Sequence, residues 1–320
     1  MLDTYERRSQ DLQSQRTGKE VTAVSAKRES ILSMPLSAYQ TWADKLTVGF
    51  LVADQFLRLE GFQKPDFLPY RTQIVPLAAI MVYLGNRWLE PVIRTKISRW
   101  FWCGVFGELY GGAIETRIAL DLVDLLHWID QPGNFEPTTV IAAGFQPSRL
   151  DTLWTRTSAA YRGLYVLLQR EGSKDFFWKA RMVELDQNEY SIDIHHIFPR
   201  AWCRSNGIPG RTSNSIINKT PISFKANRMI GGKAPSIYLA QLRNDRQVQI
   251  SMAEQNAILQ SHCIDPDSLH NDDFSRFYHY RKQRLIGLIE QAMGKPILTS
   301  TNELPADDDV EDTVTDDLID

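Results

Sequence analysis

The stretch IDIHHIFPR, residues Ile192–Arg200, places two adjacent histidines near the end of a segment of alternating polarity. Apolar and polar side chains alternate over residues 190–195, and this period of two predicts a short β-strand that stops at Pro199. Neighbouring side chains of a strand point to opposite faces. His195 and His196 can therefore serve one site only if the strand bends or finishes beside them, and Pro199 is consistent with such an end.

A second strand and a short helix are predicted directly downstream of the two histidines. A loop rich in Gly, Pro, Ser and Asn covers Ser205–Ser215, and Ile216–Ile222 is the candidate second strand. Ser223 can cap a helix over Phe224–Ile230, which a Gly-Gly pair ends. The order from residue 190 to residue 230 is therefore strand, loop, strand, helix.

The histidine pair and the short helix carry the residue types that hydrolysis of a phosphodiester requires. Such hydrolysis needs a metal ion to neutralise charge on the scissile phosphate and a base to activate water. An imidazole suits the base near neutral pH. We expect His196 to be the base and His195 and the carbonyl oxygen of Asn227 to be metal ligands. Asp193 is an alternative ligand or an orienting group, and Asn218 is expected to hold the hairpin loop through bonds to the backbone.

The expected metal is magnesium, with manganese, nickel or cobalt as alternatives because an imidazole ligand suits them. Four other histidines lack partners at ligand spacing and are predicted to be structural or solvated: His127, His262, His270 and His279. The three cysteines lie far apart in the sequence and form no CxxC pair, which argues against a disulfide framework and a four-thiolate zinc site.

The charge of the chain is distributed unevenly. The formal net charge is −3, but residues 301–320 carry nine acidic groups and no Lys or Arg, which leaves 36 basic residues against 30 acidic ones elsewhere. Residues 194–244 contain no Asp or Glu, and this window suits a polyanion such as nucleic acid. Its basic residues are Arg200, Arg204, Arg211, Lys219, Lys225, Arg228, Lys233 and Arg243. Lys219, Lys225, Arg228 and Lys233 are the candidates to bind DNA phosphates.

The rest of the chain is predicted to be mainly α-helical. Residues 1–35 are a polar N-terminal arm, residues 36–175 a helical domain, and residues 176–250 the α+β module that contains the two histidines. Within the helical domain, Ser148–Arg170 is predicted to be one long helix. Residues 251–300 form C-terminal helices that pack on the module, and residues 301–320 an acidic disordered tail. We predict no membrane-spanning helix and no secretory signal, so a cytoplasmic location is the simplest interpretation.

Four features resemble a known family: the motif HHIFP, an Asn-Lys pair at the second strand, an Asn-Arg pair on the helix, and the run KAPSIYL. The segment Asp193–Leu239 resembles the His-Me finger (HNH) nuclease fold, a ββα-metal module, and in particular the nuclease of GmrSD-type modification-dependent restriction enzymes. The resemblance implies that His195 contacts the metal, that His196 is the general base, and that Asn218 and Asn227 take the central and final motif positions. Asn replaces the His found there in many HNH proteins, and no structural zinc is implied.

The resemblance extends more weakly over Leu36–Met293, through LPYRTQIVPLAA, RWFWCGVFGELYGG and ETRIALDL. It implies DNA cleavage in restriction of phage or foreign DNA. Full-length relatives begin with a ParB-like nucleotide-binding domain that has no counterpart here, so the resemblance covers their C-terminal half and implies a separately encoded sensor partner, a fragment or a split subunit. Two alternatives remain: a nucleic-acid-binding nuclease subunit that is inactive without this sensor, and an RNA-cleaving toxin.

Overall fold

The apolar periodicity that begins at Leu36 produces a bundle of packed helices, and the chain as a whole is mainly α-helical with a small two-stranded sheet. The computed structural model describes residues 1–112, 114–131, 133, 135–185 and 192–297, apart from the side chains of Lys19 and Asp193. The predicted acidic tail, residues 301–320, lies outside the described residues. Within them, no helix combines the length and the apolarity that crossing a membrane needs.

The α-helices of the first half are α1 (Leu2–Gln13), α2 (Arg28–Leu32), α3 (Leu36–Leu59), α4 (Ile74–Leu84), α5 (Pro91–Phe106), α6 (Ile114–Asp130), α7 (Thr138–Ala142), α8 (Arg149–Thr152) and α9 (Ala159–Arg170). Those of the second half are α10 (Arg200–Ser205), α11 (Gly210–Asn214), α12 (Phe224–Ile230), α13 (Pro235–Asn244), α14 (Met252–Ser261), α15 (Pro266–His270) and α16 (Phe274–Met293). The strands are β1 (Asp193–His196) and β2 (Lys219–Ile222). Short 3-10 turns are η1 (Gly18–Glu20), η2 (Pro65–Phe67), η3 (Arg71–Gln73), η4 (Gly85–Leu89), η5 (Met182–Glu184) and η6 (Ile216–Asn218).

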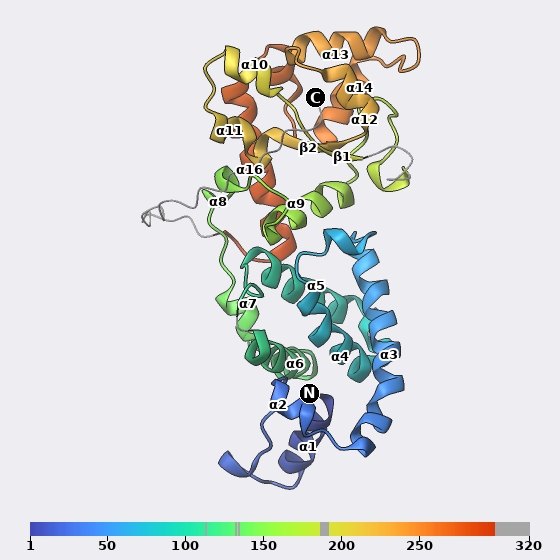
Figure 1. Cartoon of the computed structure of the whole chain (residues 1–320), viewed down its shortest axis with the longest axis vertical. Helices are drawn as coiled ribbons and strands as arrows, with labels where there is room; N and C mark the ends of the chain where they lie inside the picture. Colours follow the sequence, from blue (N-terminus) through green and yellow to red (C-terminus); the bar gives the residue numbers. More distant parts are fainter. Residues whose placement is uncertain (113, 132, 134, 186–191, 298–320) are drawn as a thin grey trace.

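The helical part is built around α4 and α5 (Figure 1). The sequence of α4, IVPLAAIMVYL, is apolar on all sides, so the helix is stable only in the interior. α3 crosses it closely at Gly49, where a Cβ atom would lie 2.5 Å from the Ala78 carbonyl oxygen. In α5, Trp100 and Trp102 are completely buried and belong to this core.

Two expectations for the helical part are corrected by the structure. Residues 1–35 are more than a polar arm, because α1 packs on α4. Leu2 belongs to the core, and the ring centroids of Tyr5 and Tyr83 lie 4.7 Å apart. The helix predicted over Ser148–Arg170 is interrupted between α8 and α9. The extended Leu153 there accepts a backbone hydrogen bond from the segment that leads into β2, and this bond competes with helix formation.

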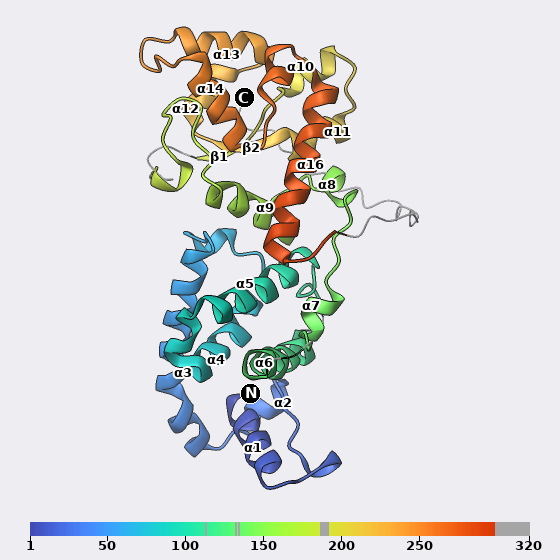
Figure 2. The ribbon, with the colours of Figure 1, turned by 180° about the vertical axis from the view of Figure 1, so that it is seen from behind.

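The second half of the chain folds around a separate apolar cluster (Figure 2). β1 and β2 are antiparallel, and α12 begins two residues after β2 ends. Ile197 and Phe198 follow β1 into this cluster, where the Phe198 ring packs on Phe274 and Phe277 of α16. The loop predicted over Ser205–Ser215 instead contains the end of α10 and all of α11. These short helices lack an apolar period, and Cys203 is the buried residue that anchors the first.

The last helix, α16, joins the two halves of the molecule. Its first turns belong to the second cluster, whereas Leu285, Ile289 and Met293 lie in the helical core and contact α5. The predicted helix at the C-terminal end of the chain is confirmed, but it packs on both parts and not on the histidine-bearing module alone.

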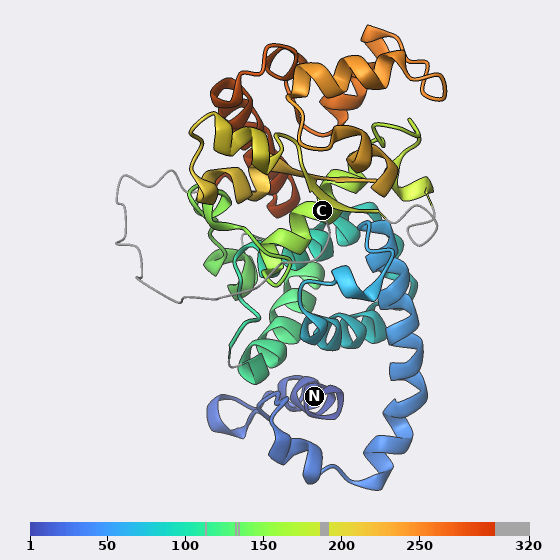
Figure 3. The same cartoon turned by 45° about the horizontal axis from the view of Figure 1, so that its top comes forward.

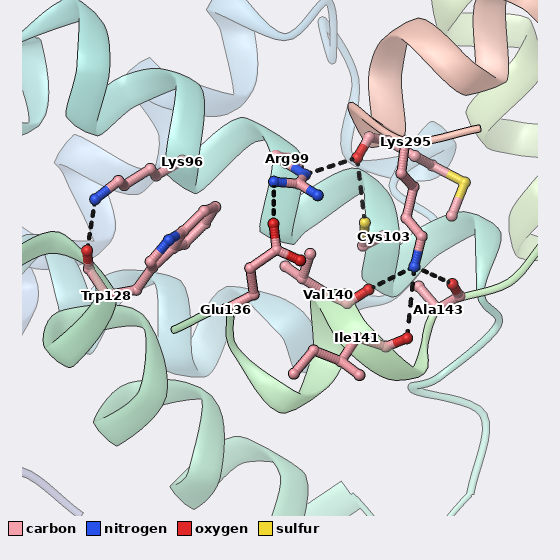
Figure 4. A network of polar contacts seen from close by, with 10 residues as sticks. Lys96, Arg99, Cys103, Trp128, Glu136, Val140, Ile141, Ala143 and Lys295 are labelled. Carbon is pink, nitrogen blue, oxygen red and sulfur yellow. Dashed lines mark hydrogen bonds and ion pairs between the residues drawn. The ribbon is translucent and has the colours of Figure 1, made fainter. Parts of the chain in front are cut away.

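Polar contacts fasten the C-terminal end of α16 to the helical part (Figure 4). Lys295 Nζ donates to the carbonyl oxygens of Val140 at 2.9 Å and Ala143 at 2.7 Å, at the end of α7. Arg99 Nε donates to Met293 O at 3.3 Å, and its Nη1 atom lies 2.5 Å from the Glu136 carboxylate. A cation at the C-terminus of a helix also interacts favourably with the helix dipole.

Candidate functional site

The two histidines end β1, and the pairing with β2 fixes the face on which each one lies. His195 is opposite Thr220 and His196 is opposite Lys219. Because side chains alternate along a strand, His195 shares one face of the hairpin with Thr220, and His196 shares the other with Lys219. β2 contacts α9, and Figure 3 brings this end of the molecule forward.

A ring nitrogen of His195 lacks a hydrogen-bond partner among the described residues. This atom, Nε2, is buried. Burial, and secondly the positive charge of Arg156, lower the pKa of His195 to about 4. The imidazole is therefore neutral at pH 7, as a metal ligand must be.

His196 is also neutral, but its ring is hydrogen-bonded. Its Nε2 atom lies 3.3 Å from Oδ1 of Asn214, the last residue of α11. Burial lowers the pKa of His196 to about 4, with Lys219, Arg200 and His195 acting in the same direction and the Asn214 contact opposing them. If the Nε2 nitrogen donates to the amide oxygen, the Nδ1 nitrogen keeps the free electron pair.

Asn218 holds the loops on either side of the hairpin, as the sequence predicts. It is completely buried, accepts from Phe198 N at 2.9 Å, and donates to Phe198 O at 2.9 Å and Ser213 O at 2.8 Å. One side chain therefore fixes both the exit of β1 and the end of α11. Since α11 carries Asn214, Asn218 also determines where the His196 partner lies.

The helix after β2 begins where the sequence predicts. The Ser223 hydroxyl accepts from Ala226 N and caps α12. Asp175, which sequence reasoning missed, accepts from Ser223 N at 2.6 Å and from Ser223 Oγ at 3.0 Å. Asn227 follows one turn into α12, partly exposed, and its amide makes no side-chain hydrogen bond to any described residue. The Asn227 amide is therefore available as a ligand. The side chain of Asp193, the alternative ligand, lies outside the described residues.

Buried polar groups support the hairpin from behind. Thr220 Oγ1 lies 2.6 Å from His262 Nδ1, and His262 Nε2 lies 2.7 Å from Lys174 O, so His262 is structural, as predicted. Arg281 of α16 is completely buried, and its guanidinium donates to His262 O at 3.0 Å and Lys219 O at 2.8 Å. It also donates to the carbonyl oxygens of Ile216 and Ile217.

One of the four residues predicted to bind DNA phosphates, Lys219, is buried and not exposed at the surface. Lys219 is only 8% exposed, and its ammonium donates to Trp154 O at 2.8 Å, because α9 and the loop before it cover that face of β2. Lys225 is partly exposed over the Phe177 ring, and Arg228 and Lys233 are exposed. Among the described residues, none of these last three forms a salt bridge with a carboxylate.

The residues around the histidines fit a metal ion only in part. The described residues contain no group of three or more His, Cys, Asp or Glu side chains that could hold a metal. The candidate ligands are the Nε2 nitrogen of His195, which has no hydrogen-bond partner among the described residues, and the amide oxygen of Asn227 on α12. A hard cation bound there would complete its coordination with water and phosphate oxygens.

Comparison with known proteins assigns no activity to this site. No protein-family model matches the chain. An uncharacterized protein of Methanocaldococcus jannaschii is 27% identical over an alignment of 215 residues that covers 60% of this chain and 36% of that protein. The chain therefore aligns with little more than a third of the length of this relative.

Proposed function

We propose that this chain is a metal-dependent endonuclease of the HNH (His-Me finger) type that hydrolyses phosphodiester bonds of DNA. One observation carries the proposal: the Nε2 nitrogen of His195 is buried without a hydrogen-bond partner among the described residues, on the strand that ends with the second histidine, His196. The two residues lie on a strand that pairs with β2, and β2 leads into α12. A GmrSD-like role in restriction of phage or foreign DNA, with a ParB-like sensor encoded separately, is part of this proposal.

The residues of the chain would divide the chemistry as follows. His196 accepts the proton of the attacking water, while Asn214 orients its ring. His195 and the amide oxygen of Asn227 hold a divalent ion, Mg²⁺ or Mn²⁺. When bound, that ion supplies charge neutralisation on the scissile phosphate and the leaving oxygen. Asn218 acts through the backbone and keeps the two strand ends together.

Exposed cations of the acid-free window support a polyanionic substrate. Arginines of the helical part such as Arg87, Arg149 and Arg170 are paired with carboxylates. In contrast, Arg228 and Lys233 of the acid-free window have no carboxylate partner among the described residues. Exposed cations without a carboxylate partner, on and just after the helix that follows β2, suit a phosphodiester backbone.

Cleavage of plasmid DNA by the full chain tests the proposal. We expect nicking with Mg²⁺ or Mn²⁺ that stops when a chelator is added. His196→Ala should lower the rate by about 10²- to 10⁴-fold, the usual contribution of a general base. His195→Ala and Asn227→Ala should weaken Mn²⁺ binding measured by titration calorimetry. The matched control is His279→Ala, because His279 is exposed on α16.

Three results would contradict the proposal or narrow it. Undiminished cleavage by His196→Ala would contradict the role of His196 as the general base. Cleavage that continues after the chelator is added would contradict the dependence on a metal ion. Binding of DNA without cleavage, followed by cleavage when a ParB-like protein is added, would favour the dependent subunit. Cleavage of RNA but not of duplex DNA, offered side by side, would favour the RNA-cleaving toxin.

A further inference from the structure

The loop between α8 and α9 belongs to the helical part of the chain, yet it lies against the histidine hairpin. Leu153 O accepts from Ile216 N at 2.9 Å, and Trp154 O accepts from Lys219 Nζ at 2.8 Å. Lys219 is the cross-strand partner of His196. Residues 153–158, about which the sequence motif says nothing, are therefore next to the candidate site.

The short helix α11 closes this surface from the other side. Its last residue, Asn214, contacts His196, and Arg211 lies three residues earlier, on the same side of the helix. The Arg211 guanidinium lies 5.7 Å from the centroid of the Trp154 ring. Such stacking is favourable and leaves the N–H groups at the edge of the guanidinium available to bind oxygen atoms.

Arg156 brings a second arginine to the same surface. It is exposed, and its carbonyl oxygen accepts from Arg162 Nε at 2.8 Å, which holds the loop in place. Trp154, two residues earlier in the same loop, contacts both Lys219 and Arg211.

We infer that residues 153–158 and α11 together form a nucleic-acid-binding surface on which Arg156 and Arg211 bind backbone phosphates next to the bond to be cut. This inference deepens the proposed function and rests on it. Guanidinium groups bind phosphate oxygens in a bidentate manner, and two of them beside the histidine pair would fix the register of the strand. The helical part of the chain then contributes directly to the substrate site.

Fluorescence anisotropy measures the binding of a short DNA duplex in EDTA over a series of salt concentrations. It therefore tests this surface without any cleavage. Arg156→Ala and Arg211→Ala should each weaken binding several-fold and reduce the slope of log affinity against log salt by about one. Arg156→Glu and Arg211→Glu should weaken it further. Arg94→Ala is the matched control, because Arg94 is exposed on α5 and has no ion pair among the described residues. Matching circular dichroism spectra and melting temperatures establish that the variants are folded.

The outcomes separate this inference from the proposed function. If the Arg156 and Arg211 variants bind DNA as the wild type does, with an unchanged salt slope, the assignment of this surface is wrong. The proposal of metal-dependent hydrolysis is not affected by that result. A wild type that binds no duplex also overturns the surface. If the wild type binds DNA and the slopes change as expected but no metal supports cleavage, the surface stands and the hydrolysis fails.

Discussion

Burial has opposite consequences for the two roles proposed for His195 and His196. It lowers the pKa of both imidazoles to about 4, so both rings are unprotonated at neutral pH. For a ligand this is an advantage, because no proton has to leave before a cation binds. For a base it is a cost, because a low pKa means weak attraction for a proton. A phosphate placed beside His196 would raise that pKa and restore basicity.

The contact between Asn214 and His196 gives a prediction at this scale. The hydrogen bond to Asn214 raises the pKa of His196, so Asn214→Ala should lower that pKa further. We expect the variant to cut DNA about 10- to 100-fold more slowly, the usual effect of losing an orienting partner. Titration of the imidazole signals by NMR checks the pKa, and its shift distinguishes positioning from a general loss of structure.

The matched control for Asn214 is Asn206→Ala, because Asn206 is exposed at the end of α10 and its side chain donates to Trp202 O. It should leave both the His196 titration and cleavage unchanged. An Asn214→Ala variant with an unaltered His196 titration and a full cleavage rate would exclude the positioning role.

Sequence reasoning found the residues whose partners are close in the chain and missed those whose partners are distant. Ser223 was predictable as a cap because it bonds to Ala226, three residues away. Asp175 bonds to Ser223 across 48 residues, and no local pattern indicates that contact. Asn214 was hidden for the same reason: within a polar loop, nothing in the sequence distinguishes it from its neighbours.

At the scale of elements, patterns with a clear period were predictable and short helices were not. The strand after residue 190, the helix α12 and the helix α13 with Pro235 in its first turn follow from alternation, a cap and an N-terminal proline. α10 and α11 have five or six residues each, too few to show a period. Tertiary contacts, such as the bond from Asn218 to Ser213 O, hold them instead.

The central role of Asn218 among these elements can be measured. Asn218→Ala removes three hydrogen bonds and takes the side-chain partner from the buried Phe198 N and Ser213 O, whereas Phe198 O keeps its contact with Cys203 Sγ at 3.5 Å. An unsatisfied buried group costs about 1–3 kcal/mol, so we expect a loss of about 3 kcal/mol or more in the free energy of unfolding. Urea denaturation measures it. An effect below about 0.5 kcal/mol, typical of a surface substitution, would contradict this assignment.

At the scale of the whole molecule, α16 makes the two cores depend on each other. The helix begins in the second cluster with Phe274 and Phe277 and ends in the helical core with Leu285 and Ile289. Between them, Arg281 donates to carbonyl oxygens of η6 and β2. No sequence pattern could predict this arrangement, because an amphipathic period shows which face of a helix is buried but not against which core.

We therefore expect the two cores to lose their structure together. Leu285→Ala removes a completely buried side chain from the helical core and should cost about 2–5 kcal/mol. Because α16 is continuous, the loss should also appear in β2 and α13, which contact the other cluster. Hydrogen exchange measures both regions at once, and protection should fall by the same factor in α5 and in β2. Gln283→Ala, exposed on the same helix, is the control. Protection lost in α5 alone would show that the cores unfold independently.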